Sequence, residues 1–353
     1  MSTRKRLSRM TAGCLLALVW TGGGAAQTVT SSLSQEALKY VAQDPGEVLR
    51  ILTSHVAKPA ATDTITRCSG MPAEGVAGVT TDHYYFLSEI GGCARLACFL
   101  KQVPGSVHAA STLIVDQACS GATAIRETLV LPDRFTLAGV GIDGEGVLAF
   151  DLPDNVPAIR FAASPGVVNR MATIRDLNLA GGCCGQVGID VSNSQFVYVR
   201  NIRLQNFAIG LFGNNAYSIF VDHGSVHNNA FNIVIGDNTT AWRLRDTVAS
   251  QGLIGIQMNA TARGHVVSGG RIESNWGPGI RVDGAMNVID GTWFEGNGQF
   301  FNTKYGVWVT SQGLKTRILA SLFSSQLIGD NGVETQACFN MSFAGGSADV
   351  NQC

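Results

Sequence analysis

The 353-residue sequence predicts an all-β fold: a right-handed parallel β-helix of about seven or more coils, preceded by a small helical segment. A six-residue segment recurs at intervals of 22 to 29 residues, and a second short strand recurs half a coil later. Apolar side chains take the same places in each repeat. The composition agrees, because 42 glycines and only 14% charged residues suit short strands joined by tight turns.

Three apolar columns appear when the repeats are aligned. The first residue of each six-residue segment reads Ile174, Val199, Val221, Leu244, Val267, Ile289 and Ile318, and the sixth reads Leu179, Leu204, Val226, Ala249, Ile272, Phe294 and Phe323. The column of the second strand reads Ile189, Leu211, Ile233, Ile256, Ile280 and Val307. No single coil can bury such a face, so the coils must stack and share one interior.

Asparagines recur just after the first strand of the repeat, at Asn206, Asn228, Asn229, Asn275 and Asn297. Asparagine tolerates a left-handed backbone and forms hydrogen bonds through its side chain. We therefore expect a turn at this point in which the side chains of successive coils stack.

We divide the chain into a signal peptide (1–26), a helical, cysteine-containing N-terminal cap region (27–111), the β-helix (112–328) and a C-terminal cap with a disulfide (329–353). Basic residues within 4–9 precede the apolar run 12–20, and small residues precede a cleavage point after Ala26. The chain is therefore expected to be secreted, either outside the cell or into a periplasm. Helix-spaced apolar residues interrupted by Pro45-Gly46 predict a broken helix or two short ones over 33–55: Leu38, Val41, Val48, Leu49 and Leu52.

Eight cysteines remain after cleavage, and an even number in an exported protein favours disulfides over metal ligation. We expect Cys338 to pair with Cys353, and one pair to form among Cys68, Cys93, Cys98 and Cys119. A vicinal Cys183–Cys184 bond is a further option. Cleavage removes four of the 25 basic residues and leaves 21 against 26 acidic ones, a net charge of about −5 that argues against a nucleic-acid partner. No stretch is apolar for long enough to span a membrane.

Four segments carry a resemblance to a known family: Thr128–Pro132, Phe135–Gly139, Thr173–Leu177 and Trp293–Asn297. Between about Thr112 and Phe323 the chain resembles the pectin-lyase-like superfamily, particularly pectate-lyase-3 type proteins related to polygalacturonases and phage tailspikes. The resemblance implies a carbohydrate polymer as ligand, so the expected partner is a polysaccharide or oligosaccharide. Trimers among the tailspike relatives make a homo-oligomer plausible.

The chain also departs from the families it resembles. Val221-Asp222-His223 is similar to the Asp-His step of pectate lyases, but no acidic calcium cluster follows it. Arg271-Ile272-Glu273 stands where polygalacturonases have Arg-Ile-Lys, and their other signatures are missing. His223 and His227 lie four residues apart on a strand and turn, a spacing that does not converge on a metal. We expect neither a metal nor a cofactor.

Two carboxylates are the candidate catalytic pair. The residue that follows each six-residue segment should face outward, and in neighbouring repeats it is Glu273 and Glu295. Glycosidases use two such groups as acid and as base or nucleophile. Candidate substrate-binding residues are His227, Arg271, Trp293, Arg203 and Trp276, with the two tryptophans as stacking surfaces. The structural alternative is that these carboxylates only accept hydrogen bonds from turn amides, with Arg271 paired to Glu295 across one rung.

The sequence thus leaves three functions open. The first is a glycoside hydrolase or lyase that cleaves a polysaccharide in a groove along the β-helix. The second is a non-catalytic glycan-binding adhesin or matrix protein, and the third is a structural solenoid without a ligand. On the remaining outward column, we expect Phe212 and Trp308 to be covered by a loop, a terminal segment or another subunit.

Overall fold

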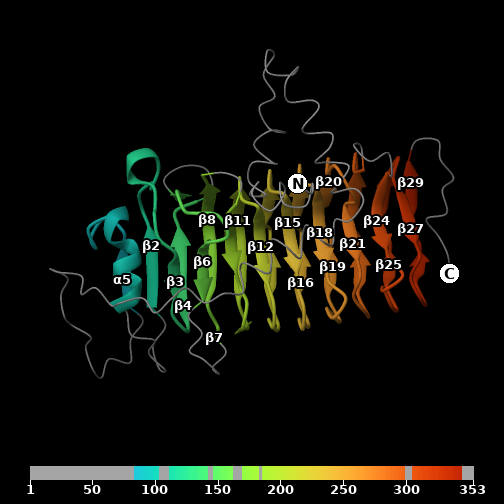
Figure 1. Cartoon of the computed structure of the whole chain (residues 1–353), viewed down its shortest axis with the longest axis horizontal. Helices are drawn as coiled ribbons and strands as arrows, with labels where there is room; N and C mark the ends of the chain where they lie inside the picture. The colour runs from blue at the N-terminus through green and yellow to red at the C-terminus, as the bar shows by residue number, and fades with distance from the viewer. Residues whose placement is uncertain are drawn as a thin grey trace, which may run out of the picture.

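The computed structural model describes residues 83–102, 111–141, 146–161, 169–182, 185–298 and 304–343. It is a right-handed parallel β-helix of about nine turns, which confirms the predicted fold class. The coils follow one another along a single axis from residue 83 to residue 343 (Figure 1). The predicted signal peptide, the helical prediction for residues 33–55, Cys183–Cys184 and Cys353 lie outside the described residues.

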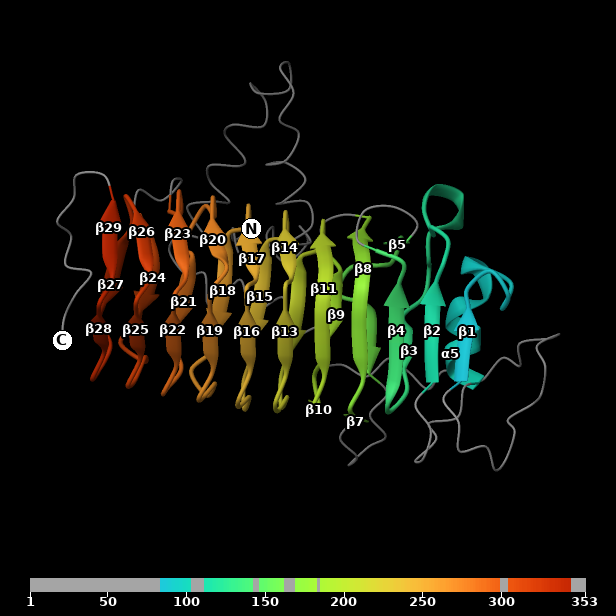
Figure 2. The same ribbon diagram turned by 180° about the vertical axis from the view of Figure 1, so that it is seen from behind.

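The strands form two long parallel sheets. The larger, which we call sheet A, contains 18 strands: β1 (His83–Phe86), β2 (Ser111–Val115), β4 (Phe135–Gly139), β5 (Val147–Phe150), β8 (Thr173–Gly181), β11 (Tyr198–Gln205), β13 (Phe220–Asp222), β14 (Ser225–His227), β16 (Arg243–Arg245), β17 (Val248–Ser250), β19 (Val266–Ser268), β20 (Arg271–Glu273), β22 (Val288–Asp290), β23 (Trp293–Glu295), β25 (Arg317–Leu319), β26 (Leu322–Ser324), β28 (Gln336–Cys338) and β29 (Met341–Phe343). Figure 2 shows these strands side by side along the solenoid.

The second sheet, sheet B, has nine strands: β3 (Leu129–Leu131), β6 (Pro157–Phe161), β9 (Val187–Asp190), β12 (Ile209–Gly213), β15 (Phe231–Ile235), β18 (Ile254–Met258), β21 (Ile280–Val282), β24 (Tyr305–Val309) and β27 (Leu327–Asp330). A third side is formed by the short pair β7 (Asn169–Arg170) and β10 (Ser194–Gln195), continued by single bridges from Tyr217 to Val333.

One short helix closes the first coil. α5 (Leu96–Gln102) follows the 3-10 turn η1 (Cys93–Arg95) and packs against β3, with Leu96 and Leu100 in the core. A second 3-10 turn, η2 (Gly121–Thr123), precedes β3. Among the described helices, none combines the length and hydropathy required to cross a membrane.

Sheet A extends beyond the 112–328 region at both ends. β1 pairs with β2, whereas β28 and β29 pair with β25 and β26. A disulfide joins Cys93 to Cys119, which confirms the expected pair among the first four cysteines. Cys98 and Cys338 are disulfide-bonded as well.

The predicted register is confirmed in all three columns. Ile174 pairs with Val199 and the column continues rung by rung to Ile318, while the sixth-position column runs from Leu179 to Phe323. In sheet B the column runs from Ile189 to Val307. All of these side chains belong to one buried core.

Each six-residue segment contains a bend that the column alignment did not anticipate. Its third residue has a positive φ in every repeat, at Asp176, Asn201, His223, Asp246, Gly269, Gly291 and Ala320. The first and sixth residues are five apart and both face inward, although strict alternation along a strand would put them on opposite faces. One left-handed residue breaks the alternation, so from β13 onward each segment forms two three-residue strands.

The expected asparagine turn is present. Asn206 and Asn228 have left-handed backbones, and Asn229, Asn275 and Asn297 are buried. Asn275 Nδ2 donates to Asn297 Oδ1 at 2.8 Å, and the Oδ1 of Asn229 accepts from the Phe207 amide at 2.8 Å. These side chains satisfy backbone groups of neighbouring coils that would otherwise be buried without partners.

A buried histidine makes stability depend on pH. His265 is 0% exposed; its Nδ1 accepts from the Trp242 amide at 3.1 Å, and its Nε2 lies 3.3 Å from Thr239 Oγ1. An amide can only donate, so Nδ1 must be unprotonated. Burial lowers the pKa of His265 to about 4.

Acidification is therefore expected to destabilise the fold between about pH 6.5 and pH 4. In this window the unfolded chain binds a proton at His265 that the folded chain does not. The free energy of unfolding therefore decreases by up to about 3 kcal/mol as the pH is lowered. Urea unfolding measured at half-unit pH steps checks this. His265→Gln should flatten the dependence, because it removes the buried imidazole. Equal pH dependence in the parent and His265→Gln would contradict the assignment.

Candidate functional site

The outer face of sheet A carries most of the candidate functional residues. Its strands present residues at the second, fifth and seventh positions of each repeat to the outside. Arginine, carboxylate and aromatic side chains occur among them, including Arg175, Arg200, Arg245, Trp293 and Glu295. Because parallel pairing keeps rungs about 4.8 Å apart, residues at one position of neighbouring coils form a regular row.

Glu273 and Glu295 occupy neighbouring rungs, as the sequence predicted. β20 pairs with β23 so that Glu273 lies opposite Glu295, and Arg271 lies opposite Trp293. The Glu273 side chain is 21% exposed and Trp293 is 43% exposed. Two carboxylates and an indole are thus presented on the same side of two adjacent rungs.

The ion pair of Arg271 differs from the one expected in the structural alternative, which paired Arg271 with Glu295. Arg271 Nη2 lies 3.0 Å from Glu273 Oε1 on its own strand, rather than pairing with Glu295 across the rung. Within the described part of the chain, the exposed Glu295 carboxylate has neither an ion pair nor a side-chain hydrogen bond. The two carboxylates therefore lie in different electrostatic surroundings despite their proximity in the ladder.

His227 lies two rungs from Glu273 in the same row, through Ser250. Its Nε2 is 3.0 Å from Gln205 Oε1, and its Nδ1 is 3.3 Å from Ser225 Oγ. Burial lowers the pKa of His227, and the nearby charge of Arg203 acts in the same direction. These contacts hold the ring against its neighbours along the row.

The other two predicted binding residues lie farther from the pair. Arg203 is in the fifth-position row, three rungs from Arg271 through Ser225 and Val248. Trp276 lies in the turn after Asn275, where its amide donates to the Gly252 carbonyl at 2.8 Å. It is partly buried and is not on the strand that carries Trp293.

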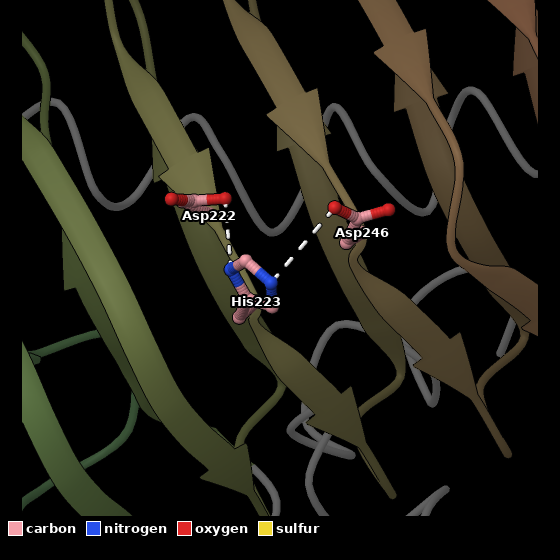
Figure 3. A group of neighbouring side chains, drawn as sticks. All are labelled: Asp222, His223 and Asp246. Atoms are coloured by element: carbon pink, nitrogen blue, oxygen red, sulfur yellow. Dashed lines mark ion pairs between the residues drawn. The ribbon is translucent and has the colours of Figure 1, made fainter.

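A second cluster, which was not predicted from the sequence, lies on the same face of sheet A. It is at the first of the two short strands of each repeat, whereas the glutamates follow the second. Asp222, His223 and Asp246 offer ligand-type atoms that all lie within 4.8 Å of one another. His223 Nδ1 is 2.9 Å from Asp222 Oδ1, and its Nε2 is 3.9 Å from Asp246 Oδ2. Figure 3 shows the imidazole between the two carboxylates, which come from neighbouring coils. A carboxylate can only accept, so Nδ1 carries the proton and Nε2 is the basic atom.

Arginines surround this cluster. Arg245 donates two hydrogen bonds to Asp222, at 2.8 and 2.7 Å, and Arg200 Nε lies 3.8 Å from the same carboxylate. The bond from Arg245 lowers the pKa of Asp222 below its usual range. Because both oxygens of Asp222 already accept from a guanidinium, and a second cation is close, the arrangement favours an ion-pair network over a bound metal ion.

The cluster can do proton-transfer chemistry. A carboxylate that fixes one imidazole nitrogen presents the other for general acid or base catalysis. The signal for it was in the alignment. The third position of the repeat reads Asp176, Asn201, His223 and Asp246 in successive coils, which are all polar and all at the left-handed bend.

The chain is thus a parallel β-helix protein with a charged and aromatic face on its longer sheet, and solved structures share the fold. DFA-IIIase from Arthrobacter chlorophenolicus A6, without its lid, has a TM-score of 0.59 at 10% identity, covering 76% of this chain and 91% of that one. ORF18 of Geobacillus virus E2 has a TM-score of 0.57 at 9% identity, covering 74% of this chain and 60% of that protein. The enzymatically active domain of tailspike protein 2 from bacteriophage CBA120 has a TM-score of 0.50 at 11% identity, covering 66% of this chain and 38% of that one.

At such identities these similarities establish the fold alone. The chain also spans less than two thirds of the Geobacillus virus protein. No protein-family model and no curated protein sequence matches the chain.

Proposed function

We propose that this protein is a secreted carbohydrate-active protein that binds a polysaccharide or oligosaccharide along the outer face of sheet A and cleaves it, as a glycoside hydrolase or a lyase. The observation that carries the proposal is the register that sets Glu273 opposite Glu295 beside the exposed Trp293. Proteins that share the fold support it, since the DFA-IIIase in complex with GF2 and the tailspike domain are carbohydrate-active.

The rung spacing suits this chemistry. Carboxylates about 5 Å apart serve a retaining glycosidase, and wider pairs serve an inverting one. Ladder partners have backbones about 4.8 Å apart, and the rotamers of the two side chains then set the separation of their carboxylates. Glu273, which is paired with Arg271, is the candidate base or nucleophile, and Glu295, which has a more open environment, is the candidate acid. In a lyase, Glu273 is the group that would take the proton.

The surroundings supply binding contacts. Trp293 offers a flat apolar surface on which a sugar ring can stack, and Arg271 and His227 offer hydrogen bonds along the rows. A small pocket lies at the corner next to Glu295, lined by residues 296–298, Lys304 and residues 324–326. The signal-type N-terminus and the Cys93–Cys119 disulfide support secretion, because such bonds persist in oxidising compartments.

Glu273→Gln and Glu295→Gln are each expected to reduce turnover by about 10²–10⁴-fold, because glutamine keeps the shape but cannot ionise or donate the same proton. A panel of polysaccharides, read by both new reducing ends and the absorbance of unsaturated products, identifies a substrate and separates hydrolysis from elimination. Trp293→Ala should weaken binding more than it slows turnover of bound substrate.

Glu334→Gln is the matched control, because this exposed glutamate pairs with Lys315 near the far end of the solenoid. Its activity should equal that of the parent. Full activity in both Glu273→Gln and Glu295→Gln, on a substrate that the parent degrades, would remove this pair from the proposal.

The Asp222–His223–Asp246 cluster is the second candidate for the reaction centre, favoured by the 2.9 Å contact that orients His223. His223→Gln separates the two sites. If His223→Gln abolishes cleavage while the glutamate variants remain active, the reaction takes place at the Asp222–His223–Asp246 cluster. If the parent binds glycans and cleaves none of them, the adhesin alternative stands.

A further inference from the structure

Two aromatic rings stack on the outer face of sheet A, several coils before the glutamate pair. Tyr198 of β11 and Phe220 of β13 are ladder partners on neighbouring coils, which Figure 2 shows side by side. Their ring centroids are 4.8 Å apart and their planes differ by 8°, so the rings lie face to face. The next residues along the chain, Val199 and Val221, are 0–1% exposed and face inward. The two rings therefore point outward, where Tyr198 is 44% exposed and Phe220 is partly exposed.

One face of the Tyr198 ring is open to a ligand. Its other face stacks on Phe220, and the residue of the same row in the preceding coil is Thr173, which carries no ring. Exposed aromatic side chains are few in the described part of the chain: Tyr84, Phe86, Phe196, Tyr198, Tyr217, Trp293 and Phe339. Three of these seven lie on the two coils of the stack, namely Phe196, Tyr198 and Tyr217. Aromatic surface gathered at one exposed place is typical of a binding site.

Arginines lie on both sides of the stack. Arg200 follows Tyr198 by two residues on the same face of β11, and Arg243 of β16 is the ladder partner of Phe220. The Arg200 side chain is 67% exposed, and its ion pair with Asp222 is long, at 3.8 Å. Arg243 is exposed and, among the described residues, forms neither an ion pair nor a side-chain hydrogen bond. Both guanidinium groups therefore have N–H donors left for a ligand.

The neighbouring charges are already paired. Arg245 donates two hydrogen bonds to Asp222, and Arg175 Nη1 lies 2.6 Å from Asp176 Oδ2. The carboxylate of Asp246 lies 3.9 Å from the imidazole of the preceding coil. The carboxylates of these coils thus have partners of their own, and the two arginines beside the rings remain for a ligand.

A sugar unit that bears a carboxylate uses both the rings and the arginines. An apolar partner would cover the rings but would bury two cations without counter-charges, which is costly. A neutral sugar would stack on Tyr198 and leave both guanidinium groups unused. A carboxylate accepts two parallel hydrogen bonds from one guanidinium. Arg245 binds Asp222 in this way on the same face, at 2.8 and 2.7 Å.

We infer that Tyr198, Phe220, Arg200 and Arg243 form a second glycan-binding site, which holds an acidic stretch of the polysaccharide away from the glutamate pair. A sugar ring stacks on Tyr198 with its carboxylate on Arg200, and Arg243, two rungs farther along, binds the carboxylate of another unit of the same chain.

The second site lies within reach of the glutamate pair for a long ligand only. Phe220 is three rungs before the coil of Trp293, or about 14 Å along the axis. A chain of several sugar units is needed to occupy both places. The second site rests on the proposed function only in that a glycan binds sheet A, and it does not depend on which residues cleave that glycan.

Affinity electrophoresis of the full mature chain tests the inference. The gels contain alginate, hyaluronan or polygalacturonate, and each polymer is compared with its carboxyl-reduced copy, which keeps the linkages but carries no charge. The protein carries Glu273→Gln with Glu295→Gln, so that cleavage by this pair does not shorten the polymer. At least one carboxylated polymer is expected to retard the protein, and carboxyl reduction should raise its Kd about tenfold or more.

In this background Tyr198→Ala and Arg243→Ala should each raise the Kd about tenfold, because each removes one contact. Tyr198→Phe keeps the ring and should bind like its parent. The matched controls are Phe339→Ala, which removes an aromatic ring that is 83% exposed, and Arg317→Ala, which removes an exposed arginine from the row of Arg243. Both controls should stay within about twofold of the parent. All of these side chains are exposed, so the melting temperatures should agree within a few degrees.

Three results would overturn the second site: no retardation by any carboxylated polymer, equal retardation by the reduced copies, or unchanged binding in Tyr198→Ala. Loss of binding in Arg243→Ala alone would reveal a surface for any polyanion and would overturn it as well. Cleavage is measured separately with the native glutamates. If binding is lost in Tyr198→Ala and Arg243→Ala but the parent cleaves no polymer, the second site stands and the cleavage proposal fails. If the glutamates cleave a polymer that Tyr198→Ala binds as well as the parent, the cleavage proposal stands and the second site fails.

Discussion

Ile256→Asp is expected to abolish the yield of folded protein. Ile256 is 0% exposed at the centre of β18, and its neighbours in the column are Ile233 and Ile280. An aspartate there would be a buried carboxylate without a partner, a change that costs several kcal/mol and often more than a domain's whole stability. Because adjacent coils share the interior, the loss would spread along the solenoid instead of staying in one coil. Soluble yield and the melting transition of any purified variant measure the effect.

Val248→Asp is the matched control for this variant. Val248 belongs to the same coil but lies in the outward fifth-position row, next to Arg271. The new carboxylate would be solvated and close to a cation, so the melting temperature should change by no more than a few degrees. Ile256→Val should cost only about 1 kcal/mol, since it removes one methyl group. An Ile256→Asp protein that melts close to the parent would mean that this column does not face the interior.

The sequence predicted the solenoid well because its signal is collective. Any one of Ile189, Ile233 or Ile256 could belong to many folds, but recurrence at one place in every coil requires a shared interior. The bend at the third position was not predicted, although the same columns contain the reason for it. Two inward columns five residues apart cannot belong to one regular strand, and His223 and Asp246 stand where the alternation must break.

For the candidate site, the sequence predicted which residues lie in the same row of the sheet, but not the contacts between their side chains. Register places Glu273 opposite Glu295, but it does not determine which side-chain rotamer each residue adopts. Arg271 pairs with Glu273 on its own strand. This contact depends on side-chain geometry and solvation, which the register does not specify. The contact between His223 and Asp222 was hidden for a similar reason, because residues adjacent in sequence point to opposite sides in a regular strand. The left-handed bend at His223 brings them together.

The solenoid also explains why exposed residues can form a defined site without a deep cavity. Each rung is fixed by its neighbours on both sides, so a row of side chains inherits the spacing of the backbone. The buried asparagine ladder contributes to this rigidity at the corner beside the Glu273 row. Asn275 follows Glu273 by two residues, and its side chain bonds to groups of both adjacent coils.

Asn275→Leu is expected to lower the free energy of unfolding by about 3 kcal/mol or more, although leucine has a similar volume. The Oδ1 of Asn275 accepts from the Gly252 amide at 3.0 Å, and its Nδ2 donates to the Ala249 carbonyl at 3.0 Å. Leucine would leave both backbone groups without this side-chain partner in a buried turn, at about 1–3 kcal/mol for each group. For a chain of 353 residues, 3 kcal/mol corresponds to a fall of roughly 4 °C in melting temperature.

Asn331→Leu is the control, because Asn331 is exposed and its side chain forms no hydrogen bond with the described residues. It should melt within about 2 °C of the parent. Denaturant unfolding of the two variants compares them on one scale. If Asn275→Leu proved as stable as Asn331→Leu, the ladder would not be supporting the corner, and the position of Glu273 would have to depend on the strand register alone. A large loss of stability in Asn275→Leu would instead show that this buried polar network supports the corner beside Glu273.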